Sequence, residues 1–186
     1  QNVGDVMLDA SIFFSPHAIK PDNVPADDFI LATLHRAENT DDSSRLSEIV
    51  SALNALHTKT PVVLPLHPRT KKAIEAAQLS LEVITIPPVS YFEMVWLLSN
   101  CMLVMTDSGG VQKEAFFFGK PCVTMRDQTE WNELVALGVN VLAKATTSDV
   151  LEKVAIMAGH QIPPRGDLYG GGNACDRIID TILGYN

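Results

Sequence analysis

Short apolar runs alternate with segments of helical spacing from residue 29 onward, and this alternation restricts the chain to few folds. The run at residues 29–34 predicts a strand buried on both faces, and the apolar spacing of residues 43–57 predicts a helix. Strands that alternate with helices build βαβ units with right-handed crossovers. The sequence therefore predicts an α/β domain with a Rossmann-like, doubly wound parallel sheet. The same pattern predicts further strands at residues 61–66, 83–86, 102–105, 122–125 and 140–142, and further helices at residues 70–78, 91–99, 109–118, 130–137 and 148–158.

Both ends of the chain fall outside this alternation. The pattern of residues 3–9 predicts a strand and a turn that continue an earlier part of a protein, and the first residue is Gln1, not Met. We therefore expect the chain to be a fragment of a longer protein. The tail is predicted to contain a non-helical connector at residues 162–166, a flexible turn at residues 169–172 and a last helix at residues 173–183, capped by Asn173.

The composition argues against several classes of partner. The 186 residues are 46% hydrophobic and 19% charged, which suffices for a core without disulfides. The formal net charge is -8 and no Lys/Arg cluster suits a duplex, so we expect no nucleic-acid partner. No apolar run approaches the roughly 18 residues of a membrane helix, and no signal peptide opens the chain. Three cysteines without a CxxC pair fit a reducing compartment, so we expect a cytoplasmic protein with no membrane partner.

Four polar clusters directly follow predicted strands. In doubly wound sheets, ligands bind beyond the carboxyl ends of the strands. We therefore expect the four clusters to lie along one edge and to share a site. They are residues 35–39, 67–69, 106–110 and 126–130.

The cluster at residues 106–110 is the most informative. A strand runs into Ser108-Gly109-Gly110, and a helix starts there. Glycine lets a ligand approach the backbone, and the free N–H groups and dipole of a helix start favour an anion. Glu114, about one turn and a third into the helix, is suited to accept both hydroxyls of a ribose whose phosphates lie at the turn. The alternative is a plain βα turn in which Ser108 caps the helix.

The histidines and arginines of the other clusters can be interpreted as functional or as structural residues. His35 and His67 follow successive strands at equivalent positions, which favours a shared role over a structural one. His35 and Glu38 have the spacing of one helical face, but no third ligand is evident, so we expect neither a metal ion nor a cofactor. Arg126 and Arg69 offer forked donors for phosphate, and the alternative for each is a surface salt bridge.

Taken together, the clusters resemble the non-hydrolysing UDP-N-acetylglucosamine 2-epimerases. That family has two Rossmann-like domains in the glycosyltransferase-B arrangement, with the active site in the cleft between them. The resemblance implies that residues 1–28 are the tail of the N-terminal domain and a linker, residues 29–160 the UDP-binding domain, and residues 161–186 a connector and C-terminal helix. The motifs that carry it are His35-Arg36-Ala37-Glu38-Asn39, His67-Pro68-Arg69, residues 106–115, residues 119–130 and Tyr169-Gly170-Gly171-Gly172-Asn173-Ala174.

The resemblance also implies roles at the phosphate turn. Ser108, Gly109 and Gly110 would hold the diphosphate of a UDP-sugar, and Glu114 would hold its ribose. The implied small-molecule partner is therefore a UDP-sugar, and the full-length protein is expected to be a homodimer.

Five further residues take roles from the same resemblance. His35, the catalytic candidate, and Arg126 would line the sugar-phosphate side of the cleft. His67 and Arg36 match positions that, in some members, help bind a second, regulatory UDP-sugar. Glu38 belongs to the same substrate-binding cluster.

The family reaction eliminates UDP across C1–C2 of the sugar to give a glycal, and UDP then adds back with C2 inverted. The acidic residues that move the C2 proton lie in the N-terminal domain, so we expect this chain alone to be inactive. Trp131-Asn132 stand where members acting on UDP-N-acetylglucosamine often have Arg-Pro. This departure resembles a branch that acts on related UDP-amino sugars.

Two alternatives remain at this stage. A glycosyltransferase of the same two-domain architecture would share the phosphate turn and the ribose glutamate, but it would pass the sugar to an acceptor. The cluster at residues 35–39 favours the epimerase. The second alternative is a UDP-sugar-binding module without chemistry.

Overall fold

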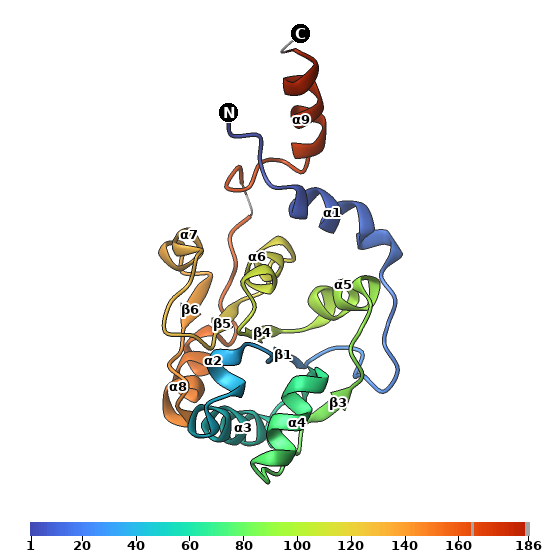
Figure 1. The fold of residues 1–186 in the computed structure, drawn as a ribbon. Helices are drawn as coiled ribbons and strands as arrows, with labels where there is room; N and C mark the ends of the chain where they lie inside the picture. Colours follow the sequence, from blue (N-terminus) through green and yellow to red (C-terminus); the bar gives the residue numbers. More distant parts are fainter. Residues whose placement is uncertain (165, 185–186) are drawn as a thin grey trace.

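The computed structural model describes residues 1–164 and 166–184, and its centre is a six-stranded sheet. All neighbouring strands are parallel, in the order β3-β2-β1-β4-β5-β6 (Figure 1). This is the strand order of doubly wound nucleotide-binding domains. The predicted α/β class and the Rossmann-like parallel sheet are confirmed.

The elements follow one another as the alternation predicts. The strands are β1 (Ile30–Thr33), β2 (Val62–Pro65), β3 (Ile84–Ile86), β4 (Leu103–Thr106), β5 (Cys122–Thr124) and β6 (Asn140–Leu142). The helices are α1 (Val6–Phe14), α2 (Ala37–Thr40), α3 (Ser43–His57), α4 (Pro68–Ala76), α5 (Tyr91–Asn100), α6 (Gly109–Phe117), α7 (Asn132–Ala136), α8 (Thr147–Met157) and α9 (Ala174–Leu183), with a 3-10 turn, η1, at Ser15–His17.

The sheet has a separate apolar layer on each face. Successive side chains of a strand point to opposite faces. Ile30 and Ala32 of β1 accordingly pack in the cluster that contains α3 and α8, whereas Leu31 packs in the cluster that contains α5 and part of α6. Figure 1 shows α3, α4 and α8 on one side of the sheet and α5 and α6 on the other.

The strand order reverses between β1 and β4, and this point positions the site. Their register pairs Thr33 with Thr106, the last residue of each strand, and the two hydroxyl oxygens lie 2.6 Å apart. The chain then turns away in opposite directions from the two strand ends. In such sheets the crevice at the reversal is where ligands bind.

Local capping explains where two of the helices begin. Ser90 and Glu93 form a reciprocal capping box at the start of α5, the helix predicted from residue 91. At α4, Nδ1 of His67 accepts the backbone N–H of Arg69 at 3.2 Å, and Pro68 occupies the first turn. The helix therefore begins two residues before the predicted residue 70.

The strand predicted at residues 3–9 is wrong, because this segment enters α1. Asp5 caps the helix by accepting the backbone N–H of Met7 at 2.8 Å. Leu8 is buried against Phe116 and Phe117 at the far side of α6. The helix is apolar almost all round, so its sequence shows little helical periodicity.

The predicted cap of the last helix is also wrong. Asn173 makes no side-chain hydrogen bond to the start of α9. Instead, the carboxylate of Asp9 in α1 accepts the backbone N–H groups of Ala174 at 3.1 Å and Cys175 at 2.7 Å. A carboxylate from another helix thus replaces the local cap, and it fastens α9, which projects from the body of the domain, to α1 (Figure 1).

The tail prediction, residues 161–186, includes Arg165, Tyr185 and Asn186, which lie outside the described residues. Within the described part, the longest helix has 15 residues, and none of the helices is long and apolar enough to cross a membrane.

Replacing Asp9 tests the long-range cap. In Asp9→Ala, the first-turn amides of α9 lose their acceptor, and we expect their protection from hydrogen exchange to fall by about 0.5–2 kcal/mol. Asn173→Ala is the matched control and should leave this protection unchanged. Faster exchange in Asn173→Ala with no change in Asp9→Ala would contradict the long-range cap and support the local cap by Asn173.

Candidate functional site

The buried carboxylate of Asp107 joins the ends of β1 and β4. It is fully buried, and it accepts the backbone N–H of His35 at 3.1 Å and of Arg36 at 2.9 Å. The side-chain amide of Asn39 donates to it at 3.3 Å, and Nδ1 of His35 lies 3.3 Å from Oδ1. Because a buried carboxylate is costly without donors, these contacts stabilise it. The clusters after the two strands therefore form one unit.

Asn39 extends this unit to the end of β5. Its amide nitrogen also donates to the carbonyl oxygen of Met125 at 2.9 Å, and its amide oxygen accepts from Arg45 at 3.2 Å. The guanidinium of Arg45 reaches Asp127 at 3.0 Å and Glu38 at 3.3 Å. Three of the four predicted clusters thus meet at one edge of the sheet.

The turn before α6 has the features of an anion site. Ser108 occupies the N-cap position with extended backbone, yet its hydroxyl makes no capping hydrogen bond within the described residues. Its backbone N–H is held by the hydroxyl of Thr106 at 2.9 Å. The hydroxyl of Ser108 and the first-turn N–H groups of α6 are therefore available to a ligand, as a phosphate site requires.

Trp131 packs over this turn. Its indole N–H donates to the carbonyl oxygen of Gly109 at 2.8 Å. Beneath the ring, Nζ of Lys113 lies 4.3 Å from the ring centroid and 2.6 Å from a carboxylate oxygen of Asp5. A methyl group on Gly109 would contact Arg36, Glu130 and Trp131, so the glycine leaves space between the turn and these side chains.

Arg126 is buried between two carboxylates. Its Nη1 donates to both oxygens of Glu130, at 3.0 and 2.9 Å. Its Nε lies 3.8 Å from Glu38 and has no hydrogen-bond partner among the described residues. Hydrogen bonding from Arg126 lowers the pKa of Glu130. Arg36 approaches the same carboxylate at 3.7 Å. Glu130 therefore pairs with arginines. It precedes α7, which begins at Asn132, whereas the sequence predicted a helix that begins at residue 130.

Glu114 is a buried carboxyl group without a donor. It is 8% exposed, and none of the described residues hydrogen-bonds to its carboxylate. Burial raises its pKa to about 7, an effect that the neighbouring Lys113 partly offsets. Burial raises the pKa of the nearby Tyr91 hydroxyl, and the charge of Glu114 raises it further. A carboxyl group in this state is suited to a ligand that brings its own donors.

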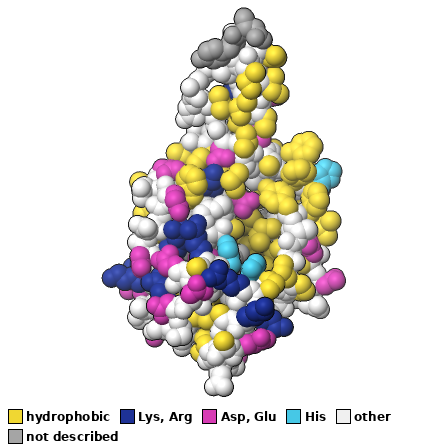
Figure 2. Space-filling model, viewed as in Figure 1, with side chains coloured by type: hydrophobic (Ala, Val, Ile, Leu, Met, Phe, Trp, Pro, Cys, Tyr) yellow, Lys and Arg dark blue, Asp and Glu magenta, His cyan; other side chains and the backbone are white. Residues whose placement is uncertain are grey.

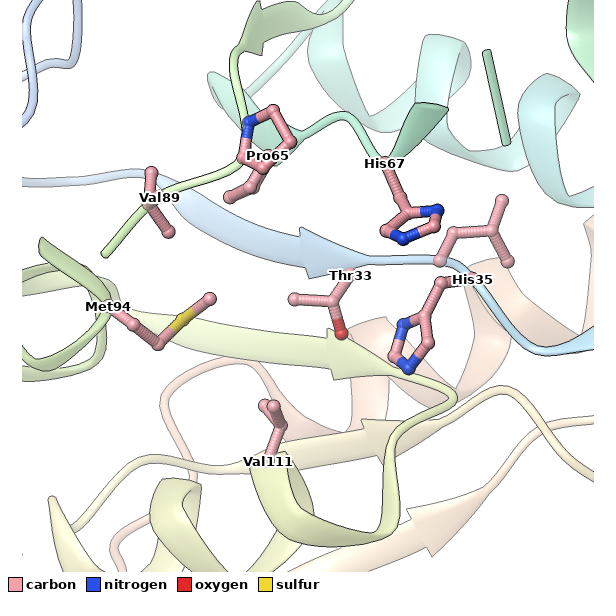
Figure 3. Close-up of a pocket in the computed structure, with 9 residues that line it drawn as sticks. Thr33, His35, Pro65, His67, Val89, Met94 and Val111 are labelled. Carbon is pink, nitrogen blue, oxygen red and sulfur yellow. The ribbon is translucent and has the colours of Figure 1, made fainter. Parts of the chain in front are cut away.

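A pocket of about 230 Å³ opens beside the start of α6. Figure 3 shows His35 and His67 at one end and Val89 and Met94 at the other. The two imidazole rings lie 6.3 Å apart, centroid to centroid. Figure 2 shows histidines near the middle of this face, between Lys/Arg side chains and a hydrophobic hollow. The lining is Thr33, Leu34, His35, Pro65, His67, Pro88, Val89, Met94 and Val111.

At three residues the structure adds to or decides between the sequence predictions for the site. The guanidinium of Arg69 is engaged by the carboxylate of Asp41 at 2.6 and 2.7 Å, so it forms the surface ion pair that was its alternative. Sequence reasoning assigned no role to the side chains of Asp107 and Asn39, which organise the site. No group of three His, Cys, Asp or Glu side chains in the described chain is placed to hold a metal ion.

The comparisons with known proteins agree with this geometry. The profile of the UDP-N-acetylglucosamine 2-epimerase family matches residues 1–183. This chain belongs to that family. A relative from Pseudomonas aeruginosa, UDP-2,3-diacetamido-2,3-dideoxy-D-glucuronate 2-epimerase, is 59% identical over 97% of this chain and 52% of its own length. The UDP-N-acetylglucosamine 2-epimerase of Methanocaldococcus jannaschii is 36% identical over 98% of this chain and 54% of its own length. The chain thus spans about half the length of these curated relatives.

Solved structures extend the likeness to three dimensions. The Methanocaldococcus jannaschii UDP-GlcNAc 2-epimerase in complex with UDP-GlcNAc and UDP superposes with a TM-score of 0.87 at 35% identity, over 99% of this chain and 54% of that one. The glycosyltransferase VinC in complex with dTDP gives a TM-score of 0.63 at 16% identity, over 91% of this chain and 45% of that one. The second likeness concerns the fold alone.

The raised pKa of Glu114 makes stability depend on pH. The unfolded chain releases this proton near pH 4.5 and the folded chain near pH 7. The stability that protonated Glu114 contributes is therefore fully present below about pH 4.5 and lost as pH rises through 7. In Glu114→Gln this loss is absent, so the stability of the variant relative to wild type should rise by on the order of 3 kcal/mol from pH 4.5 to 8. Urea unfolding at each pH measures it, and a pH-independent difference would contradict the assignment.

Proposed function

We propose that this chain is the UDP-binding half of an enzyme that inverts C2 of a UDP-2-acetamido sugar. The observation that carries the proposal is the arrangement along α6. An open turn, a buried carboxyl to which no described residue donates, and a pocket lie along α6, beside the point where the strand order reverses. The chain's membership of the 2-epimerase family supports the same reading.

The nucleotide is proposed to lie along α6, from its first turn to the pocket beside it. Its diphosphate meets the hydroxyl of Ser108 and the N–H groups at Gly109 and Gly110. Val111 and Glu114 are three residues apart and so share one face of α6. With Val111 lining the pocket, the base is assigned to the pocket and the ribose hydroxyls to Glu114.

Five further residues are assigned to the sugar side of the diphosphate. His35 and Arg126 are proposed to line it, with His35 as the catalytic candidate. Glu38 holds Arg126 from the other side, 3.8 Å from its Nε. Arg36 and His67 are proposed to contact a second UDP-sugar. His67 borders the same pocket as His35, which supports a second molecule in contact with the first.

The reaction assigned to this site begins when a base removes the C2 proton. The C1–O bond then breaks, its electron pair leaves with the diphosphate, and a glycal forms. Negative charge grows on the departing diphosphate, and preorganised donors at the α6 turn stabilise it. UDP adds back to C1 as a proton returns to the opposite face of C2. The proton-transfer groups are assigned to the half of the enzyme outside this chain.

The division of the chain follows from the same proposal. Residues 29–160 form the UDP-binding domain, and residues 1–28 and 161–186 connect it to a second domain. The exposed apolar side chains of α9, Ile179, Ile182 and Leu183, support a covering partner for this helix. We propose that the full-length protein is a homodimer.

The proposed substrate is UDP-2,3-diacetamido-2,3-dideoxy-D-glucuronate rather than UDP-N-acetylglucosamine. The relative named for the first sugar is 59% identical to this chain, and the Methanocaldococcus jannaschii relative named for the second is 36% identical. Trp131-Asn132, in place of Arg-Pro, supports this choice. A glycosyltransferase is not favoured, because VinC resembles the chain at the level of the fold alone.

Deuterium incorporation tests the proposed reaction. The full-length protein, incubated in D2O with the diacetamido-glucuronate nucleotide and no acceptor, should place deuterium at C2 and form the inverted sugar. UDP-N-acetylglucosamine should react more slowly. The 186-residue chain alone should bind UDP without exchanging C2. Turnover that requires an acceptor would instead identify a glycosyltransferase, and exchange by the chain alone would contradict the placement of the proton-transfer groups.

A further inference from the structure

We propose that Asp107 is a positioning residue, which holds His35 with its ring hydrogen on Nδ1 and so presents Nε2 to the ligand. The part of this inference that concerns catalysis rests on the proposed function. The structural part rests on the contacts of Asp107 alone.

Every hydrogen bond that the described residues make with the carboxylate of Asp107 is donated to it. Its Oδ2 accepts the backbone N–H of His35 at 3.1 Å, the backbone N–H of Arg36 at 2.9 Å and the amide of Asn39 at 3.3 Å. Its Oδ1 accepts the backbone N–H of His35 at 3.2 Å and faces Nδ1 of the same residue at 3.3 Å. A carboxylate has acceptors and no donor. The ring nitrogen that faces it is therefore the one favoured to carry hydrogen.

Two other histidines are set the opposite way. Nδ1 of His67 accepts the backbone N–H of Arg69 at 3.2 Å, and Nδ1 of His57 accepts the backbone N–H of Val62 at 3.0 Å. In both rings Nδ1 is the acceptor, so the hydrogen of the neutral ring is on Nε2. His35 is thus expected to be the opposite tautomer of His57 and His67 in the same molecule.

The contact also couples His35 to the phosphate turn. Asp107 directly precedes Ser108; its carboxylate accepts the backbone N–H of His35, and its Oδ1 lies 3.3 Å from Nδ1 of the ring. The ring and the N-cap of α6 therefore keep a fixed relation as a ligand binds. Nε2 of the neutral ring then offers its lone pair on the pocket side.

Tautomers are read directly by long-range proton–nitrogen NMR of the 15N-labelled chain above the histidine titration range. We expect the Nδ1–H pattern for His35 and the Nε2–H pattern for the internal controls His57 and His67. An Nε2–H pattern for His35 in the wild-type chain would overturn the inference, and no variant or ligand is needed for this decision.

Asp107→Asn inverts the contact with little change of shape. With its oxygen kept for the backbone N–H groups, the new amide nitrogen faces Nδ1 of His35 and donates to it. The ring should switch to Nε2–H, while His57 and His67 do not change. A folded variant in which His35 keeps the Nδ1–H pattern would contradict the proposal. If the variant does not fold, the wild-type spectrum alone decides which ring nitrogen of His35 carries the hydrogen.

The same substitution in the full-length protein separates positioning from structure. We expect kcat to fall about 100-fold or more with a much smaller change in KM, since the ring keeps its place but presents the wrong atom. An unchanged kcat beside a switched tautomer would refute the catalytic part. Absence of activity in the wild-type protein would refute the proposed function, and the tautomer would still decide the role of Asp107.

Discussion

The carboxylate of Asp107 is the group on which the rest of the site depends. It sits at the reversal between β1 and β4, where two chain segments diverge and leave backbone N–H groups without partners in the sheet. By accepting those groups it fixes the loop that carries His35 and Arg36 against the turn that carries Ser108. Asn39 then adds the end of β5 through Met125. The geometry of three strand ends follows from one buried charge.

This arrangement explains how a chain with a formal net charge of -8 provides a site for an anion. Long-range fields are screened within about 8 Å at physiological ionic strength, so the local donors decide. Arg126 is balanced by Glu130 and Glu38, so the Ser108 hydroxyl and the first-turn N–H groups of α6 are the donors that we propose for the phosphates. Such donors are fixed in place before the ligand arrives, which suits a diphosphate that departs and returns.

The sequence predicted what depends on local pattern and missed what depends on distant contacts. Elements such as β6 and α3, whose apolar spacing is strong, have the predicted bounds. The helix α1 was missed because its sequence is apolar almost all round and shows little helical periodicity, and Asp5, its cap, also pairs with Lys113, 108 residues away. The cap of α9 comes from Asp9, 165 residues before Ala174. The motif at residues 106–110 was recognised from the sequence. The hydrogen bonds that Asp107 accepts were not, because they come from residues such as His35, 72 positions away.

A uridine nucleotide is proposed to lie along α6, with its phosphates at Ser108 and its ribose on Glu114. Calorimetry of the chain with UDP and with 2′-deoxy-UDP, for wild type and Glu114→Gln, tests it most directly. Above its raised pKa of about 7, Glu114 is ionised and makes charge-assisted hydrogen bonds, the stronger kind, so at about pH 8 the variant should lose about 10-fold or more in UDP affinity. It should also lose most of the wild-type preference for UDP over the deoxy form. Equal discrimination by wild type and variant would contradict the placement of the nucleotide.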